Sequence, residues 1–230
     1  MFYGFDIYYF ILIIPALLFG LWAQSQVNTN FQKYSKIGTM RGMTGAQAAE
    51  YILQQNGIYD VQIRHVSGHH SDNFNPRNKT INLSDSVYNS TSIAAIGVAA
   101  HEAGHAVQHA VNYAPIRIRE MIIPVTQIGS WLYLPIIMVG FLVSSQTLVN
   151  VGILLFSTLA IFQFVTLPVE FDASGRAIRT LESSGILYGE EITGAKKVLK
   201  AAALTYVAAL VSSLAQLLRL ILIFGGRRRD

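Results

Sequence analysis

The sequence predicts an α-helical integral membrane protein, with about four transmembrane helices and a small α+β domain outside the bilayer. Hydrophobic residues make up 52% of the 230 residues and charged residues 13%, and the mean hydropathy is +0.39. An ordinary soluble domain of this length is less apolar. The segments between the apolar stretches total about 130 residues, which is enough for one small core but not for two domains.

The charge balance and the lack of cysteine narrow the classes of partner and metal site. The net charge is +4, but no basic stripe with interleaved aromatic residues runs along the chain, so nucleic acid is not an expected partner. Basic residues that flank membrane spans explain the charge better. Without cysteine there is no disulfide framework and no thiolate ligand. Any zinc ion must therefore be bound by histidine and carboxylate side chains.

The first three apolar stretches are predicted spans. Residues 7–23 have no Lys or Arg before them and no clear cleavage site after them, which indicates a retained anchor rather than a signal peptide. Residues 121–144 and 148–167 are separated by three residues and predict a helical hairpin. Pro124 and Pro135 lie in the second span, and neighbouring helices can accommodate the kinks they introduce.

The fourth apolar stretch, residues 201–224, is long enough to span at about 36 Å. It carries Arg219 and is rich in Ala and Ser, so the alternative is an amphipathic helix that lies on the soluble domain. If all four stretches span, segments 24–120 and 168–200 share one side and hold thirteen basic residues, against three in residues 227–229. The positive-inside rule then places that side in the cytoplasm. The three arginines would also fit inside if the last helix does not cross.

The segment after the first span predicts a small mixed fold. Residues 44–57 have a threonine cap, apolar residues at helical spacing and a glycine stop, and they predict a helix. Residues 58–66 predict a strand, and residues 67–76 predict a loop because they are rich in Gly, Asn, Asp and Pro. Residues 79–83 alternate with a period of two, which predicts a second strand.

An apolar helix is predicted over residues 93–108, with Ser90 or Thr91 as its cap. Within it stands the sequence His-Glu-Ala-Gly-His at residues 101–105. In a helix, His101 and His105 lie one turn apart on one face, where two imidazoles can bind one zinc ion. Glu102 lies beside them and can act as the general base of a zinc hydrolase.

A catalytic zinc site needs a third protein ligand and keeps its fourth position for water. Residues 168–176 contain close acidic residues, and Pro168 permits a helix to restart there. Glu170 would lie in the first turn, facing the same way as Ser174, and is the favoured ligand. Asp172 lies about 200° away around the helix. The alternative for either acid is an ordinary first-turn carboxylate favoured by the helix dipole.

Two runs, DNFNPRNKTINLSDSVYNSTSIAAIGVAAHEAGHAVQ and VEFDASGRA, together with the span pattern, closely resemble the YugP-like membrane zinc metallopeptidases of bacteria. The resemblance covers essentially the whole chain. More distantly, HExxH followed by E-x-x-A resembles the HtpX and CAAX-prenyl protease group, and this implies a zincin-like domain. The resemblance implies that His101, His105 and Glu170 bind one zinc ion and that Glu102 is the base.

One departure from the distant group concerns the support of a zinc-bound histidine. That group usually has E-x-x-A-D, and here Ser174 stands at the Asp position. Support must then come from elsewhere, and Asp172 is the residue that we expect to supply it.

Further polar residues have two interpretations each. His109 extends the His101 face by a turn and is either a pocket or supporting residue or a structural histidine. One of His65, His69 and His70 can have an oxyanion or substrate role, although solvated loop histidines are the default. Arg176 can stabilise an oxyanion, but pairing with a carboxylate or a lipid headgroup is favoured.

These observations predict a multi-pass zinc endopeptidase of the bacterial plasma membrane, with its active site in the cytoplasm. Its partners would be the lipid bilayer and protein substrates that are membrane-embedded or close to the membrane, and residues 80–83 could offer a strand edge to the substrate. The alternative is a membrane scaffold whose zinc is structural; such a site would not need Glu102. A transporter is disfavoured, because the spans offer essentially only Arg219 as an ionisable residue.

Overall fold

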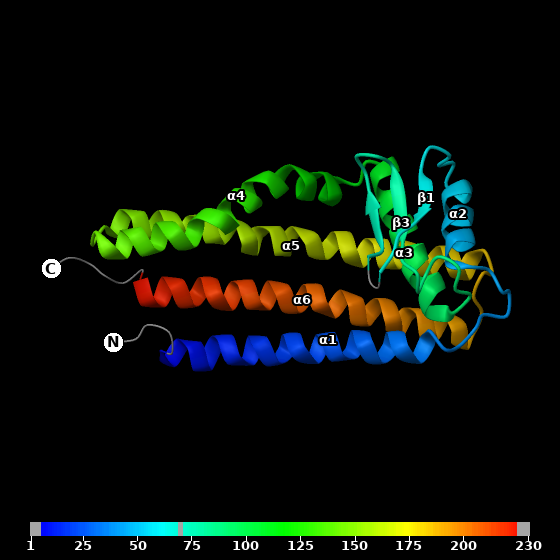
Figure 1. Ribbon diagram of the computed structural model, residues 1–230, viewed down its shortest axis with the longest axis horizontal. Helices are drawn as coiled ribbons and strands as arrows, with labels where there is room; N and C mark the ends of the chain where they lie inside the picture. Colours follow the sequence, from blue (N-terminus) through cyan, green and yellow to red (C-terminus); the bar gives the residue numbers. More distant parts are fainter. Residues whose placement is uncertain (1–5, 69–70, 225–230) are drawn as a thin grey trace. The chain divides into compact units, whose positions relative to one another are not determined.

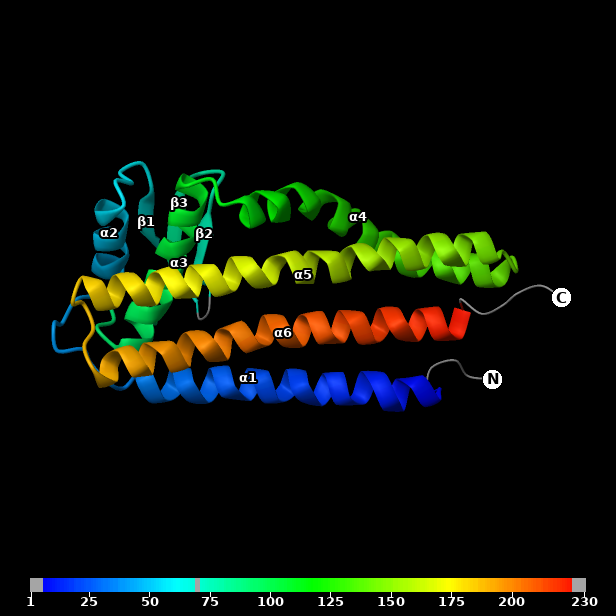
Figure 2. The same ribbon diagram turned by 180° about the vertical axis from the view of Figure 1, so that it is seen from behind.

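The structure is a computed structural model that describes residues 6–68 and 71–224. It is mostly helical, with one small sheet (Figures 1 and 2). The elements in chain order are η1 (Tyr9–Ile13), α1 (Ile14–Tyr34), α2 (Gly45–Gln55), β1 (Gln62–His65), β2 (Asn73–Asn75), β3 (Thr80–Leu83), α3 (Ile93–Ala110), α4 (Ala114–Leu142), α5 (Gln146–Ser183) and α6 (Glu190–Phe224).

Four helices in the described part of the chain are long and apolar enough to cross a membrane. They are Tyr9–Tyr34, with 26 residues, α4 with 29, α5 with 38 and α6 with 35. The prediction of four long apolar helices is therefore confirmed. All four continue beyond the predicted spans, and each also contributes residues to the compact unit that contains Gln24–Arg117 and Pro168–Leu204.

The second and third long helices form the predicted hairpin. The connection covers residues 143–145, and Ser144 takes a left-handed conformation with φ of 53°. Pro124 and Pro135 both lie inside α4, which is bent along its length (Figures 1 and 2). The helix ends at Leu142, two residues before the predicted boundary.

Pro168 does not start a new helix, and the prediction of a restart there is wrong. α5 runs without interruption from Gln146 to Ser183, so the third span and the segment that carries Glu170 are one element. Proline removes a single backbone N–H from the ladder of a helix that keeps all its other turns, and packed neighbours can offset that loss. Glu170 is therefore not a first-turn residue, and the helix dipole does not explain it.

The chain divides into two compact units. Of the described residues, one unit contains 6–23, Ile118–Leu167 and 205–224. The other contains Gln24–Arg117 and Pro168–Leu204, and all of the predicted metal ligands belong to it.

In the first unit, an ion pair joins the ends of two helices that lie side by side in both views (Figures 1 and 2). The Arg219 Nη2 of α6 lies 2.6 Å from the Asp6 Oδ2, and its Nε lies 3.1 Å from the same oxygen. Asp6 also accepts the N–H of Tyr9 at 2.9 Å, and the Arg219 guanidinium lies over the Tyr9 ring. Arg219 in the fourth apolar stretch is thus neutralised by an acid at the start of the first.

We expect Arg219→Gln to lower the thermal stability of the purified protein in detergent, by about 2–3 kcal/mol, because Asp6 loses its partner. The double variant Asp6→Asn, Arg219→Gln should recover part of that loss, since it leaves no unpaired charge. Melting temperatures of the two single variants and the double variant measure the coupling. Simple additivity of the three values would show that the pair contributes nothing.

Helix caps fix the start of α2 and α3 in the second unit. Thr44 and Gln47 form a capping box: the Thr44 hydroxyl accepts the Gln47 N–H, and the Gln47 side chain accepts the Thr44 N–H. The predicted threonine cap is confirmed. α3 is capped by Ser92, whose hydroxyl accepts the Ala95 N–H, so the prediction of Ser90 or Thr91 is wrong. Ser90 instead donates a hydrogen bond to the Ser92 hydroxyl.

The sheet has the order β1-β3-β2, with β1 parallel and β2 antiparallel to β3. β2 lies within residues 67–76, which were predicted to be a loop. The strand was missed because three residues rich in asparagine have almost no sequence signature of a strand. β3 is the central strand and is paired on both sides. The prediction that residues 80–83 offer a free edge to a substrate is therefore wrong. The two edges belong to β1 and β2.

The core of the second unit surrounds α3, which packs against α2 and the sheet. α3 also approaches α5 closely at Gly104, where an added Cβ would lie only 2.7 Å from the backbone oxygen of Ala173. The glycine inside the His-Glu-Ala-Gly-His sequence therefore allows backbone contact between two helices.

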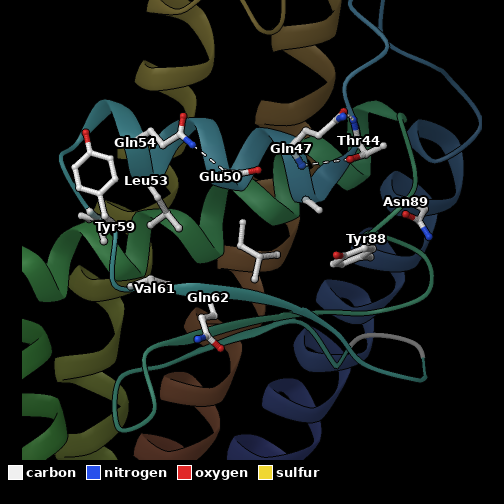
Figure 3. A pocket seen from close by; sticks show the side chains of 13 residues that line it. Thr44, Gln47, Glu50, Leu53, Gln54, Tyr59, Val61, Gln62, Tyr88 and Asn89 are labelled. Carbon is white, nitrogen blue, oxygen red and sulfur yellow. Dashed lines mark hydrogen bonds between the residues drawn. The ribbon is translucent and has the colours of Figure 1, made fainter.

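A groove of about 750 Å³ lies between α2 and β1, on the side of the sheet away from β2 (Figure 3). Its lining includes Glu50 and Gln54 of α2 and Gln62 of β1. None of the predicted metal ligands lines this groove.

Candidate metal centre

Three side chains from two helices converge on one point. α3 presents His101 and His105, and α5 presents Glu170. The two Nε2 atoms lie 3.1 Å apart, and the Glu170 Oε2 lies 3.2 Å from that of His101 and 3.5 Å from that of His105. Ligand atoms around a tetrahedral zinc ion with bonds of about 2.0 Å lie about 3.3 Å apart. The spacing of the three ligand atoms therefore fits one tetrahedral zinc ion.

The site is buried, so its polar groups need compensation. The exposed fraction of the side chain is 3% for Glu170, 11% for His105 and 13% for His101. Burial lowers the pKa of the His105 imidazole, but the hydrogen bond to Glu170 and the negative charges of Glu102 and Glu170 outweigh it, so that its pKa is raised. Burying two imidazoles and a carboxylate at one point is costly unless a cation or protons balance the charge.

Each histidine is oriented by a hydrogen bond at its other nitrogen. The His101 Nδ1 lies 3.1 Å from the Ser174 hydroxyl, and the His105 Nδ1 lies 3.0 Å from the Gln108 Oε1. A proton on each Nδ1, donated to these oxygens, leaves both Nε2 lone pairs free for a metal. Ser174, at the position where the distant group has Asp, thus contacts a predicted ligand directly.

Gln108 is fully buried and was not predicted. Besides its contact with His105, its Nε2 donates to the Val169 backbone oxygen at 2.8 Å and to the Asp172 Oδ2 at 2.9 Å. Asp172 therefore supports His105 only through Gln108, and not by direct contact. A lone amide three residues after His105 in an apolar helix was the available signal.

Arg176 pairs with a carboxylate, which was the favoured interpretation. Its Nε lies 2.6 Å from the Asp172 Oδ2, and its guanidinium lies over the Tyr113 ring. The arginine therefore neutralises the acid that accepts the Gln108 amide.

Glu102 is buried and lies outside the group of three ligands. Its Oε2 accepts the backbone N–H of Phe74, in β2, at 2.8 Å. His109 contacts the same residue, with its ring 5.9 Å from the Phe74 ring, and is not among the converging ligands.

The remaining histidines lie apart from the site or outside the described residues. The His65 Nε2 lies 2.7 Å from the Asp85 Oδ1, and its ring packs near Tyr88. His69 and His70 fall outside the described residues, so their predicted oxyanion or substrate role stays a prediction.

Comparison with known proteins identifies a family and a relative of this chain. Residues 9–225 match the model of a family described as "Putative neutral zinc metallopeptidase". The chain belongs to this metallopeptidase family. A curated relative, the "Putative membrane protease YugP" of Bacillus subtilis (strain 168), is 45% identical over 219 residues, which cover 95% of this chain and 97% of the relative. The resemblance to YugP-like proteins is confirmed. The search of solved structures gave no match.

In this member of the metallopeptidase family, we expect Gln108→Leu to weaken zinc binding by about tenfold to a hundredfold. Leucine has a similar volume but cannot accept the His105 proton or donate to α5. Zinc affinity, measured by competition with a chromophoric chelator, tests this. Gln55→Leu, at the exposed end of α2, is the matched control and should leave zinc affinity unchanged. An unchanged affinity in Gln108→Leu would show that His105 needs no such partner.

Proposed function

We propose that this chain is a zinc-dependent endopeptidase of the membrane, with a zincin-like site that binds one zinc ion. His101, His105 and Glu170 hold the metal, and Glu102 is the general base. The convergence of three ligand atoms at spacings of 3.1 to 3.5 Å carries the proposal. Membership of a zinc metallopeptidase family supports it.

The bound zinc ion would polarise the scissile carbonyl and make its water more acidic. The protein residues do the rest. Glu102 takes a proton from the water as its oxygen forms the new C–O bond, and then passes this proton to the amide nitrogen, after which the C–N bond breaks and the amine leaves. Because the site is mostly buried, little water screens the charges within it, and the electrostatic interactions between them are stronger than they would be in bulk water.

The alternative, a scaffold with structural zinc, fits less well. A structural site normally closes with four protein ligands, and the described residues bring together three. A buried carboxylate that binds no metal, Glu102, stands next to a ligand in sequence. A general base in hydrolysis needs such a group beside the metal, whereas a structural zinc site does not require one.

We further propose that the substrates are membrane proteins or membrane-proximal segments. Only two residues separate Glu170 from the end of the predicted third span, and they belong to the same helix. The basic residues of segments 24–120 and 168–200 favour a cytoplasmic site in a multi-pass protein of the bacterial plasma membrane. The partners are then the lipid bilayer and a protein or peptide substrate, without nucleic acid.

The test is cleavage of an unfolded reporter by the purified full chain in liposomes. The same peptide sequence is offered free in solution and attached to a lipid anchor. We expect cleavage that is lost with a zinc chelator, restored by zinc, and faster for the anchored peptide. Equal rates for both forms would contradict the membrane-proximal substrate class. Zinc binding without cleavage of any unfolded reporter would favour the scaffold.

A further inference from the structure

We infer that the edge strand β2 positions the general base, through a hydrogen bond from the Phe74 backbone N–H to Glu102. This inference rests on the proposed function and adds a positioning residue to it. Phe74 does not touch the reacting atoms. It acts on the carboxylate that does.

The hydrogen bond makes the two oxygens of Glu102 different. Oε2 accepts the Phe74 N–H at 2.8 Å, whereas Oε1 accepts no hydrogen bond from the described residues. A carboxylate with two free oxygens can rotate about its terminal bond, since that torsion is broad. Bonding one oxygen to a fixed amide removes this freedom and leaves the other oxygen to receive the proton of water.

The position of Phe74 in the ladder explains why its amide is available. Residues in an antiparallel pair alternate between bonding to the partner strand and pointing away from it. Phe74 stands opposite Ile81 of β3 and donates its N–H to Glu102, so this N–H points away from β3. Its neighbours Asn73 and Asn75 then bond to β3. The outer edge of β2 therefore faces α3.

Side chains outside the ladder fasten this short strand to β3. The Asp72 carboxylate accepts the Ser84 N–H at 2.7 Å and its hydroxyl at 3.0 Å. The Asn73 Oδ1 accepts the Asn82 amide at 3.1 Å. A three-residue strand would otherwise be weakly held, and these contacts fix the position of the Phe74 N–H.

The Phe74 ring is also held by α3. Its centroid lies 5.9 Å from that of His109, at an interplanar angle of 63°. Glu102 and His109 are seven residues apart, which is two turns of one helix face. One strand residue is thus fixed at its backbone by Glu102 and at its side chain by His109. This contact gives His109 a role that does not involve the metal.

The sharpest test replaces the Phe74 amide by an ester. Phenyllactic acid incorporated at position 74 during cell-free synthesis into nanodiscs keeps the ring and removes only the N–H. An ester at Asn75, which removes a ladder hydrogen bond instead, is the matched control. We expect the ester at position 74 to lower kcat by about tenfold or more. KM for an anchored peptide, zinc content and melting temperature should stay within the range of the control.

A second measurement does not depend on activity. The amide of an edge residue that points away from its sheet exchanges quickly with solvent unless something binds it. We expect the Phe74 amide to exchange slowly in the zinc-loaded full chain and at least tenfold faster in Glu102→Ala, whereas the Asn73 and Asn75 amides should be unaffected.

Each other outcome overturns the inference in a distinct way. Equal losses in both esters would show that β2 matters only for stability. A faster rate in the ester at position 74 would show that the bond restrains Glu102. Unchanged kcat in that ester, with an active wild type, would overturn the positioning role alone. An inactive wild type that holds zinc would instead overturn the proposed function.

Discussion

Glu102→Gln should abolish peptide hydrolysis and leave zinc binding intact. We expect a fall in kcat of about a thousandfold, which lies within the usual contribution of a general base. Glutamine has the same shape, and its amide oxygen can still accept the Phe74 N–H. It cannot take a proton from water. Only the chemical step is therefore removed.

The measurement is turnover of an anchored peptide by wild type and variant in the same liposomes, with zinc content determined on both. Glu50→Gln is a control for the loss of one acidic charge. Glu50 lines the groove between α2 and β1 and is not one of the proposed site residues. This variant should keep full activity. If Glu102→Gln retained more than a tenth of the wild-type kcat, another residue would have to be the base.

Glu170→Gln should lose the metal itself. Its carboxylate is the only negatively charged member of the three converging ligands, and it is nearly fully buried, with 3% of its side chain exposed. A neutral amide binds zinc far more weakly than a carboxylate, and the two histidines then face an unfilled position. We expect zinc affinity to fall by a hundredfold or more, and activity to fall with it.

Two variants on the same helix separate this effect from general damage to α5. Asp172→Asn should weaken zinc binding less, since Asp172 acts only through Gln108. Glu182→Gln removes an exposed acid that pairs with Lys196 and should change nothing at the site. Equilibrium dialysis against zinc ranks the three variants. If Asp172→Asn lost more zinc than Glu170→Gln, the assignment of Glu170 as the third ligand would be wrong.

The features that sequence could predict are those set by nearby residues. The apolar period of α3, the His101 and His105 spacing, and the Thr44 cap each depend on contacts within about one helical turn. Glu170 was found because a zinc site demands a third ligand, and the structure places it beside both histidines. The roles of Glu170 as a metal ligand and of Glu102 as the general base stay predictions, which the variants above test.

The features that sequence missed depend on distant partners. The central place of β3 is a property of the sheet order, and no residue of β3 itself encodes which strands flank it. Gln108 meets Val169 and Asp172 from α5, more than 60 residues later in the chain. Pro168 misled the prediction because its local preference for a helix start was overridden in a long helix.

Gly104 gives the spacing between the ligand helices an unusual origin. Helix propensity favours alanine over glycine by about 1 kcal/mol at an ordinary interior position. Here the methyl group would collide with the Ala173 backbone oxygen, three residues from Glu170, and would wedge α3 and α5 apart. The distance from the histidines to the acid is thus set by a missing side chain. A change that makes α3 a better helix would make it a poorer half of the metal site.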